Sequence, residues 1–222
     1  MQIAVLGGTG DLGRALVLRW AYHTDHDVLV GSRDAERAQE AVTEYEQTVS
    51  EVGGDPNIVG LDNGKAAEDA EIVVCSVPAY YLVEAIETVS AGLDAGDVLV
   101  SPAVGMTRDD DGVHYNPPDA GSVLALAADV TPERVAVVGA FHNLAAGRLA
   151  DLSRNLDVHT PVVGNDSAAV STLVGLAEEI EGLRAYSAGP LANAPEVEAL
   201  TPLLVNLAMY NDELQDTAVT FE

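Results

Sequence analysis

The opening residues 1–20, MQIAVLGGTGDLGRALVLRW, decide the fold class. A short apolar run leads into closely spaced glycines, and apolar residues at helical spacing follow. In the pattern Gly8-x-Gly10-x-x-Gly13, the first glycine would allow a tight turn, the second the approach of a pyrophosphate, and the third close packing of helix on strand. Free N–H groups and the helix dipole would then stabilise the anion. The stretch predicts a nucleotide-binding βα unit, and a purely structural turn is the alternative.

The same alternation of strand and helix continues to about residue 139. The later β-branched runs are DVLV, NIVG, EIVVCSV, DVLVSP and RVAVVG, and helix-length segments separate them. Apolar runs buried on both faces and joined in this way indicate a parallel sheet with right-handed crossovers. The predicted fold class is therefore α/β, a doubly wound (Rossmann-type) parallel sheet.

The pattern changes after residue 142. We expect a strand at 157–164, a helix at 167–180, a strand around 183–188 and a last helix at 196–211, which Pro202 should kink or divide. The expected domains are a nucleotide-binding domain at 1–147 and a small C-terminal α/β lobe at 148–222. The polar stretch TRDDDGVHYNPPDAG, residues 107–121, is expected to be a surface loop before a short helix.

The charge is strongly negative. With 36 acidic and 10 basic residues the formal net charge is −26, and the charges are scattered among apolar segments. Such self-repulsion is screened in molar salt, so the composition suggests a protein that works in concentrated salt. It makes nucleic acid and anionic membranes poor partners.

Two further features of the sequence, its hydropathy and its cysteine content, bear on where the protein is located. No apolar stretch approaches the roughly 20 residues of a membrane-spanning helix, and the start does not resemble a secretory signal, so we expect a soluble, cytoplasmic protein. Cys75 is the only cysteine, and its apolar neighbours favour a buried structural thiol.

The end of the second predicted strand indicates which dinucleotide binds. An NAD enzyme carries an acid there to bind the ribose 2′-OH, whereas this chain has Gly31, Ser32 and Arg33. A hydroxyl and a guanidinium suit a 2′-phosphate, and Arg37 would lie on the same side as Arg33. The alternative is a Ser32 that caps a helix beside a solvated arginine.

The sequence resembles the coenzyme F420-dependent NADP oxidoreductases, in an acidic form of the haloarchaeal type. The stretches that carry the resemblance extend over nearly the whole chain: LGGTGDLGRALVLRWA, VGSRDAERA, VVCSVPAYY, VLVSPAVG, VVGAFHNLAAGRLADL and EIEGLRAYSAGPLANAPEVEALTPLLVNLAMYN. The resemblance implies hydride transfer between NADP(H) and the 8-hydroxy-5-deazaflavin coenzyme F420. It also implies small-molecule coenzymes as partners and a homodimer.

The resemblance further implies roles for particular residues on the NADP side. The pyrophosphate would be held by Thr9, Gly10, Asp11 and Leu12, in the loop that Gly8 and Gly13 flank. The 2′-phosphate would be held by Ser32, Arg33 and Arg37.

On the reacting side, Val77, Pro78 and Ala146 would lie near the nicotinamide, and His142 and Leu144 would face the deazaflavin. The chain departs from the family at AYY, residues 79–81, which leaves the role of Tyr81 open. It departs again at Ala145, where proline would be closer to the pattern.

Direct hydride transfer needs stacking, a short donor–acceptor distance and exclusion of water, so we assign no catalytic residue. His142 is the best polar candidate, and a histidine tied to backbone is its alternative. The other histidines, His23, His26, His114 and His159, share no ligand spacing, and we predict no metal site.

Two other functions stay open. A small-molecule NADP-dependent dehydrogenase or imine reductase would share the first domain, but a catalytic lysine is expected there, and the sole lysine, Lys65, follows the third predicted strand away from the cleft. A non-catalytic NADP-sensing module would carry the same glycine loop.

Overall fold

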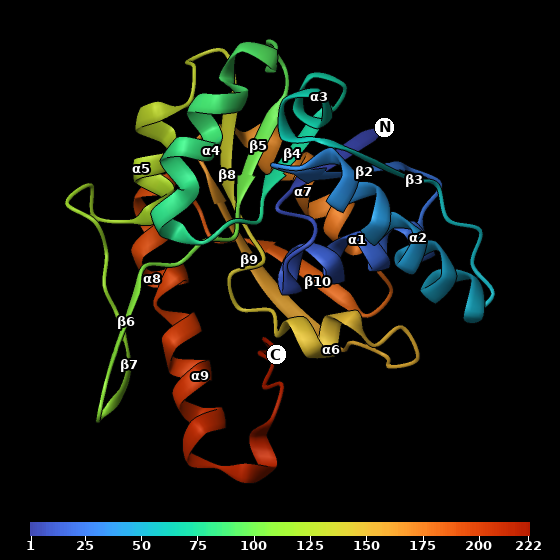
Figure 1. Ribbon diagram of the computed structural model, residues 1–222. Helices are drawn as coiled ribbons and strands as arrows, with labels where there is room; N and C mark the ends of the chain where they lie inside the picture. The colour runs from blue at the N-terminus through green and yellow to red at the C-terminus, as the bar shows by residue number, and fades with distance from the viewer.

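The computed structural model describes residues 1–222, and one eight-stranded sheet runs through its centre (Figure 1). The strand order is β3-β2-β1-β4-β5-β8-β9-β10. The first six strands are parallel, β9 is antiparallel to β8, and β10 is parallel to β9. The strands are β1 (Gln2–Leu6), β2 (Asp27–Ser32), β3 (Ile58–Asp62), β4 (Ile72–Cys75), β5 (Val98–Ser101), β8 (Ala136–Gly139), β9 (Val158–Gly164) and β10 (Leu183–Ser187). The doubly wound α/β prediction is confirmed.

Helices cover both faces of the sheet, because consecutive apolar side chains of the central strands point to opposite faces and both sets must be buried. Ile3 and Val5 pack with the helices of one face, and Ala4 and Leu6 with those of the other. The first face carries α1 (Asp11–His23), α2 (Ala35–Glu51) and α7 (Ser167–Glu178), and the second carries α3 (Asn63–Glu68), α4 (Leu82–Val89) and α5 (Val123–Val130). Cys75 lies in the second cluster, where burial raises the pKa of its thiol to about 12.

The prediction of a surface loop at 107–121 is partly wrong. Its first half forms a two-stranded hairpin of β6 (Met106–Asp109) and β7 (Gly112–Tyr115). All four residues of β6 are exposed, so this strand lacks the apolar alternation by which strands are recognised. Its pairing depends on a tight turn in which Gly112 has a φ of +133°.

The predicted last helix is divided, as expected. Its parts are α8 (Ala194–Glu198) and α9 (Leu200–Tyr210), and Pro202 lies in the first turn of α9, where its missing N–H costs no helical hydrogen bond. In Figure 1, α9 projects beyond the sheet with the β6–β7 hairpin on one side and the C-terminal segment on the other. The Asn206 amide joins α9 to the hairpin through the N–H and C=O of Val113, at 2.8 and 2.7 Å.

A buried carboxylate fixes α8 to the main body. Glu198 is fully buried, and it accepts hydrogen bonds from the N–H groups of Val123 and Leu124 and from the Tyr115 hydroxyl, at 3.1, 2.9 and 2.9 Å. Burial raises the pKa of Glu198, and these three donors oppose the shift. One side chain thereby connects α8, the start of α5 and the hairpin.

The segment after residue 147 extends the sheet of the first part. Strands β9 and β10 continue that sheet, and the larger apolar cluster contains residues of α1, α2, α7 and β9 together. The short α6 (Ala146–Ala150) packs on α1, where the buried Arg19 donates to the carbonyls of Leu149 and Asp151 at 2.7 and 2.6 Å. A functional division near residue 147 stays a prediction.

Candidate functional site

A pocket of about 420 Å³ opens at the carboxyl ends of β1, β2 and β4, where open α/β sheets bind ligands. Its lining brings together residues that lie far apart in the sequence. The predicted site residues among them are Thr9, Gly10, Ser32, Arg33, Arg37, Val77 and Pro78. Gly8, Asp11, Leu12, Gly13 and Ala146 are not part of the lining.

The tight turn of the glycine loop is made by Gly7, which the sequence pattern did not single out. Gly7 has a φ of +74°, and a Cβ there would lie 2.6 Å from the Ser76 carbonyl oxygen. A Cβ on Gly13 would lie 2.5 Å from the Gly7 oxygen, so Gly13 allows α1 to pack closely on the turn. The paired glycines at 7 and 8 were the sequence signal for this role.

The start of α1 offers donors to an anion. Gly10 is its N-cap and supplies no capping side chain. The N–H groups of the first helical turn have no intrahelical partner, so those of Asp11, Leu12 and Gly13 remain available at the positive end of the helix dipole. This is the chemistry that a pyrophosphate requires.

The end of β2 offers a hydroxyl and two guanidinium groups. The Ser32 oxygen accepts a hydrogen bond from the Asp34 N–H at 3.2 Å, which leaves its own proton available to a ligand. The cap of α2 is Asp34, which accepts from the Glu36 N–H, so Ser32 does not cap this helix. Arg33 and Arg37 take part in none of the five ion pairs.

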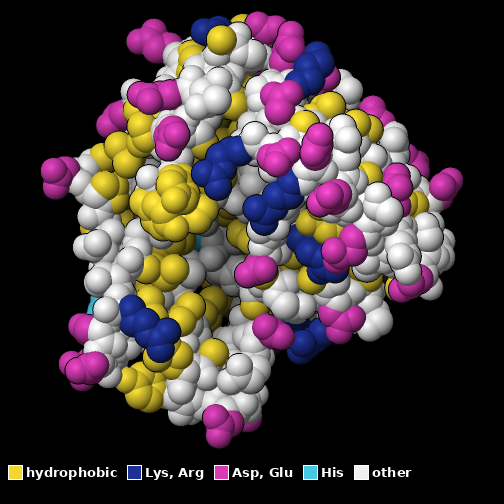
Figure 2. All heavy atoms as spheres, viewed as in Figure 1, with side chains coloured by type: hydrophobic (Ala, Val, Ile, Leu, Met, Phe, Trp, Pro, Cys, Tyr) yellow, Lys and Arg dark blue, Asp and Glu magenta, His cyan; other side chains and the backbone are white.

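Arg14 is the one arginine of this acidic chain that forms an ion pair, and what distinguishes Arg33 and Arg37 is that both line the same pocket. Figure 2 shows Asp and Glu side chains spread over this face, and basic side chains gathered near its middle beside a hollow. Two guanidinium groups without a carboxylate partner, in a pocket that also exposes a serine hydroxyl, fit a bound phosphate dianion.

Two further lining residues were not assigned from the sequence. The Asn63 Oδ1, at the start of α3, is buried and has no hydrogen-bond partner. The Tyr81 ring lies 5.6 Å from the Cζ of Arg33. Position at the end of a strand was the available signal for Asn63, but nothing in the sequence linked Tyr81 to Arg33.

A second pocket, of about 530 Å³, lies between the segment after β8 and α9. His142, Leu144 and Ala145 line one wall, and Leu204 and Ala208 of α9 line another. The two predicted deazaflavin residues therefore share one cavity. Only the tertiary structure brings α9 to that cavity.

The backbone of this wall is strained and firmly held. Phe141 is fully buried with a φ of +66°, a conformation that costs free energy in a residue with a side chain. Its N–H donates to the Thr160 oxygen at 3.1 Å, Thr160 donates to the Asn143 Oδ1 at 3.0 Å, and Asn143 donates to the His159 carbonyl at 2.7 Å. Strain of this kind, fixed by buried hydrogen bonds, is typical of functional sites.

The His142 ring is buried, and neither of its nitrogens has a hydrogen-bond partner. Burial lowers the pKa of this imidazole to about 4, so it is neutral at neutral pH. The alternative interpretation, a ring hydrogen-bonded to backbone, is not observed. It is the His142 carbonyl that forms a hydrogen bond, which it accepts from the Thr201 hydroxyl at 2.7 Å.

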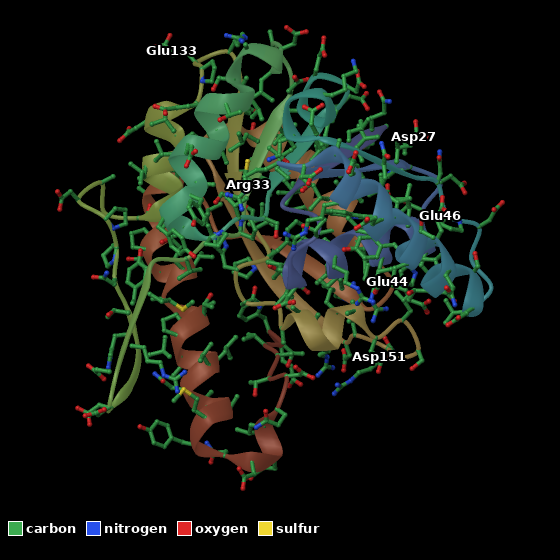
Figure 3. All side chains as sticks on the ribbon, in the orientation of Figure 1. Asp27, Arg33, Glu44, Glu46, Glu133 and Asp151 are labelled. Carbon is green, nitrogen blue, oxygen red and sulfur yellow. The ribbon has the colours of Figure 1, made fainter.

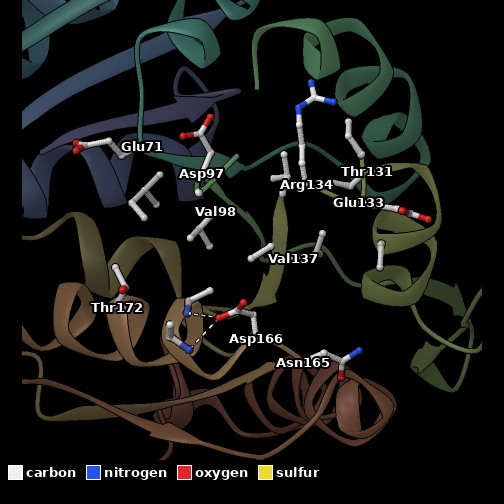
Figure 4. Close-up of a pocket in the computed structure, with 18 of the residues that line it drawn as sticks. Glu71, Asp97, Val98, Thr131, Glu133, Arg134, Val137, Asn165, Asp166 and Thr172 are labelled. Atoms are coloured by element: carbon white, nitrogen blue, oxygen red, sulfur yellow. Dashed lines mark hydrogen bonds between the residues drawn. The ribbon is translucent and has the colours of Figure 1, made fainter. Parts of the chain in front are cut away.

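A third pocket, of about 660 Å³, lies at the opposite edge of the sheet (Figure 4). Three of its four carboxylates accept hydrogen bonds within the protein: Glu71 from the Gln2 N–H, Asp97 from the Asp94 N–H, and Asp166 from two N–H groups at the start of α7, while Glu133 is free. Its arginine, Arg134, donates to the Leu93 and Ser90 carbonyls. An anionic coenzyme would meet repulsion there.

The structure contains no group of three or more His, Cys, Asp or Glu side chains placed to bind a metal ion. None of its helices has both the length and the apolar character needed to span a membrane.

Comparison with known proteins agrees with this geometry. Residues 2–105 match the family model described as NADP oxidoreductase coenzyme F420-dependent. The F420-dependent NADP reductase of Methanocaldococcus jannaschii is 36% identical over 93% of this chain and 92% of its own length. The reductase of the same name from Methanothermobacter marburgensis is 36% identical over 95% and 94%.

A crystal structure from Arthrobacter sp. FB24, described as that of a candidate F420-dependent NADP-reductase, shares the fold with a TM-score of 0.82. It is 22% identical and covers 100% of this chain and 99% of its own. The sequence identity to the two archaeal reductases, which extends over nearly the whole chain, places this protein in the family of coenzyme F420-dependent NADP oxidoreductases.

Proposed function

We propose that this enzyme transfers a hydride reversibly between NADP(H) and coenzyme F420. The observation that carries the proposal is the pair of unpaired arginines, Arg33 and Arg37, beside Ser32 at the end of β2. The relatives named as F420-dependent NADP reductases support it across both the nucleotide-binding part and the C-terminal part of the chain.

NADP fits the residues of the first pocket. The N–H groups at the start of α1 bind the pyrophosphate, while Ser32, Arg33 and Arg37 bind the 2′-phosphate. Val77 and Pro78 follow β4 and direct the nicotinamide toward the second pocket, with Ala146 at the start of α6. The nicotinamide supplies the hydride when it is bound.

The deazaflavin is the second substrate, and its proposed site is the pocket lined by His142 and Leu144. The neutral His142 ring carries one donor and one acceptor, both buried behind the wall of this pocket and without a partner in the protein. Apolar side chains of Leu144 and α9 exclude water from a flat ring, which protects the hydride during transfer. Reduction of the deazaflavin by NADPH takes up one proton in addition to the hydride; solvent supplies that proton after the transfer, and we assign no residue as its donor.

Reduction of a small carbonyl or imine substrate, the alternative enzymatic function, receives less support. A carbonyl or imine reductase needs a general acid near the substrate. Lys65 is exposed on α3, where it pairs with Glu68 and Asp69 at 3.2 and 2.7 Å. A sensing module would bind NADPH without turnover.

The test mixes purified enzyme in molar KCl with NADPH and oxidised F420, and then with NADP and reduced F420. We expect the visible absorbance of the deazaflavin to fall in the first mixture and to rise in the second, with no NADPH oxidation by small aldehydes, ketones or imines. Tight NADPH binding without any change in deazaflavin absorbance would favour the sensing module.

A homodimer through α9 also belongs to the proposal. The sequence of α9, LTPLLVNLAMY, carries no charge in a chain of net charge −26, and Leu203 and Tyr210 are 54% and 66% exposed. Two such chains repel each other over most of their surface, so an uncharged apolar face is where a second copy can approach. Sedimentation should give a dimer that Leu203→Glu converts to a monomer.

The acidic surface supports operation in concentrated salt. Its self-repulsion should be screened at molar KCl, so the melting temperature should rise with salt. An unchanged melting temperature would contradict this. A cytoplasmic location stays a prediction.

A further inference from the structure

Arg33 has one specific partner in the structure, the ring of Tyr81. The guanidinium carbon lies 5.6 Å from the ring centroid, within the range of a cation–π contact. Arg33 takes part in none of the ion pairs. Figure 3 shows Arg33 near the middle of the molecule, beside α4, which begins directly after Tyr81. The arginine therefore reaches across the pocket from β2 to the opposite wall.

Tyr81 is itself held in place by its surroundings. It ends the 3₁₀ turn η1 (Ala79–Tyr81), and its N–H donates to the Pro78 carbonyl at 2.8 Å. Its ring packs on the Tyr80 ring with a centroid distance of 4.4 Å. The turn thus fixes the backbone of Tyr81, and its ring, which is 42% exposed, presents a surface against which the long arginine side chain can rest.

The same pocket holds carboxylates that would compete for Arg33. Asp34 and Glu84 both line it, yet neither forms an ion pair with the arginine. A guanidinium that turned toward either carboxylate would be partly neutralised before a phosphate arrived. Contact with an uncharged ring keeps the charge available and reduces the number of rotamers lost on binding.

We propose that Tyr81 is a positioning residue that holds Arg33 ready for the 2′-phosphate and thereby increases the preference for NADP(H) over NAD(H). The inference rests on the proposed function, in which Arg33 binds this phosphate. It gives a role to the aromatic residue at which the chain departs from its family's pattern.

The test measures binding of 2′,5′-ADP and of 5′-AMP by isothermal titration in molar KCl. Removing the ring with Tyr81→Leu should weaken 2′,5′-ADP about two- to fivefold, the size of an exposed cation–π contact. Binding of 5′-AMP should stay within twofold, because it lacks the phosphate that Arg33 binds. Tyr81→Phe keeps the ring and should bind both ligands as the wild type does.

Tyr186→Leu is the matched control, since Tyr186 lies on β10, is 44% exposed against 42% for Tyr81, and has no cation–π contact with Arg33. It should leave the ratio of the two affinities unchanged. In an Arg33→Ala background, Tyr81→Leu should have no further effect on 2′,5′-ADP, because the group that it positions is gone.

The outcomes separate the two hypotheses. If Arg33→Ala weakens 2′,5′-ADP and Tyr81→Leu does not, the positioning role fails and the phosphate site stands. Equal weakening of both ligands by Tyr81→Leu would identify an adenine contact and overturn the positioning role. If Arg33→Ala itself leaves 2′,5′-ADP unaffected, the proposed phosphate site fails.

Discussion

The two pockets at the carboxyl edge of the sheet are built in different ways. The nucleotide pocket depends on short segments, in which the glycine turn, the start of α1 and Ser32–Arg33 each follow directly from a strand. The His142 pocket depends on contacts between distant residues, such as Thr201 with the His142 carbonyl and Asn206 with Val113. Local sequence therefore sets the first pocket, while tertiary packing sets the second.

The largest effect should come from breaking the contact that fixes α8. Glu198→Ala leaves two buried N–H groups of α5 without a partner and leaves the Tyr115 hydroxyl only the Gly121 carbonyl, at 3.4 Å, so contacts across sequence separations of 74 to 83 residues are lost. We expect a loss of about 3–4 kcal/mol in the free energy of unfolding.

Chemical denaturation with fluorescence detection measures that loss. Glu198→Gln, which can still accept a hydrogen bond, should cost less, about 1–2 kcal/mol. If both variants are as stable as the wild type, the second pocket does not depend on this distant contact.

The nucleotide pocket should respond to one local change. Arg33→Ala should weaken NADPH by roughly 1.5–3 kcal/mol more than NADH, because a charge-assisted contact to the 2′-phosphate is lost. Titration of both nucleotides measures the difference, and Arg108→Ala, on the exposed β6, is the matched control. Equal losses for NADPH and NADH would remove Arg33 from the phosphate site.

The buried His142 makes the second pocket sensitive to pH. Its pKa is about 4 in the folded protein and 6.5 in the unfolded chain, so below about pH 6.5 the unfolded state binds the proton more readily. This group should therefore lower the stability by about 2 kcal/mol between pH 7.5 and pH 5.

Comparison with His142→Leu isolates this effect, because all other titrating groups are shared. The stability advantage of the leucine variant should grow by that amount as the pH falls. A pH-independent difference would show that the imidazole titrates normally and is solvated.

The smallest effect should come from the link between α9 and His142. Thr201→Val removes the hydrogen bond to the His142 carbonyl and should cost about 1 kcal/mol of stability. Because that bond positions the proposed deazaflavin wall, the KM for F420 should rise while the Kd of NADPH stays the same. Steady-state kinetics and NADPH titration separate these quantities, and a change in NADPH affinity alone would contradict the division into two pockets.

The sequence by itself determined the doubly wound sheet and the nucleotide loop. These features rest on short continuous apolar runs that alternate with helical patterns and on glycines next to strands, which are local features of the sequence. It also determined that β2 ends in Ser32 and is followed by Arg33, so that no acid stands at the end of this strand to bind a ribose 2′-OH. The cation–π contact of Tyr81 is different, because it joins two residues that no local pattern connects.

Only the tertiary structure decided how the His142 pocket is built. The β6–β7 hairpin escaped prediction since its first strand is wholly exposed, and its position depends on α9 through Asn206. The left-handed Phe141 is set by a hydrogen bond to Thr160, nineteen residues away. Such contacts form only when the chain folds, because each alone is too weak to fix a distant segment against its conformational entropy.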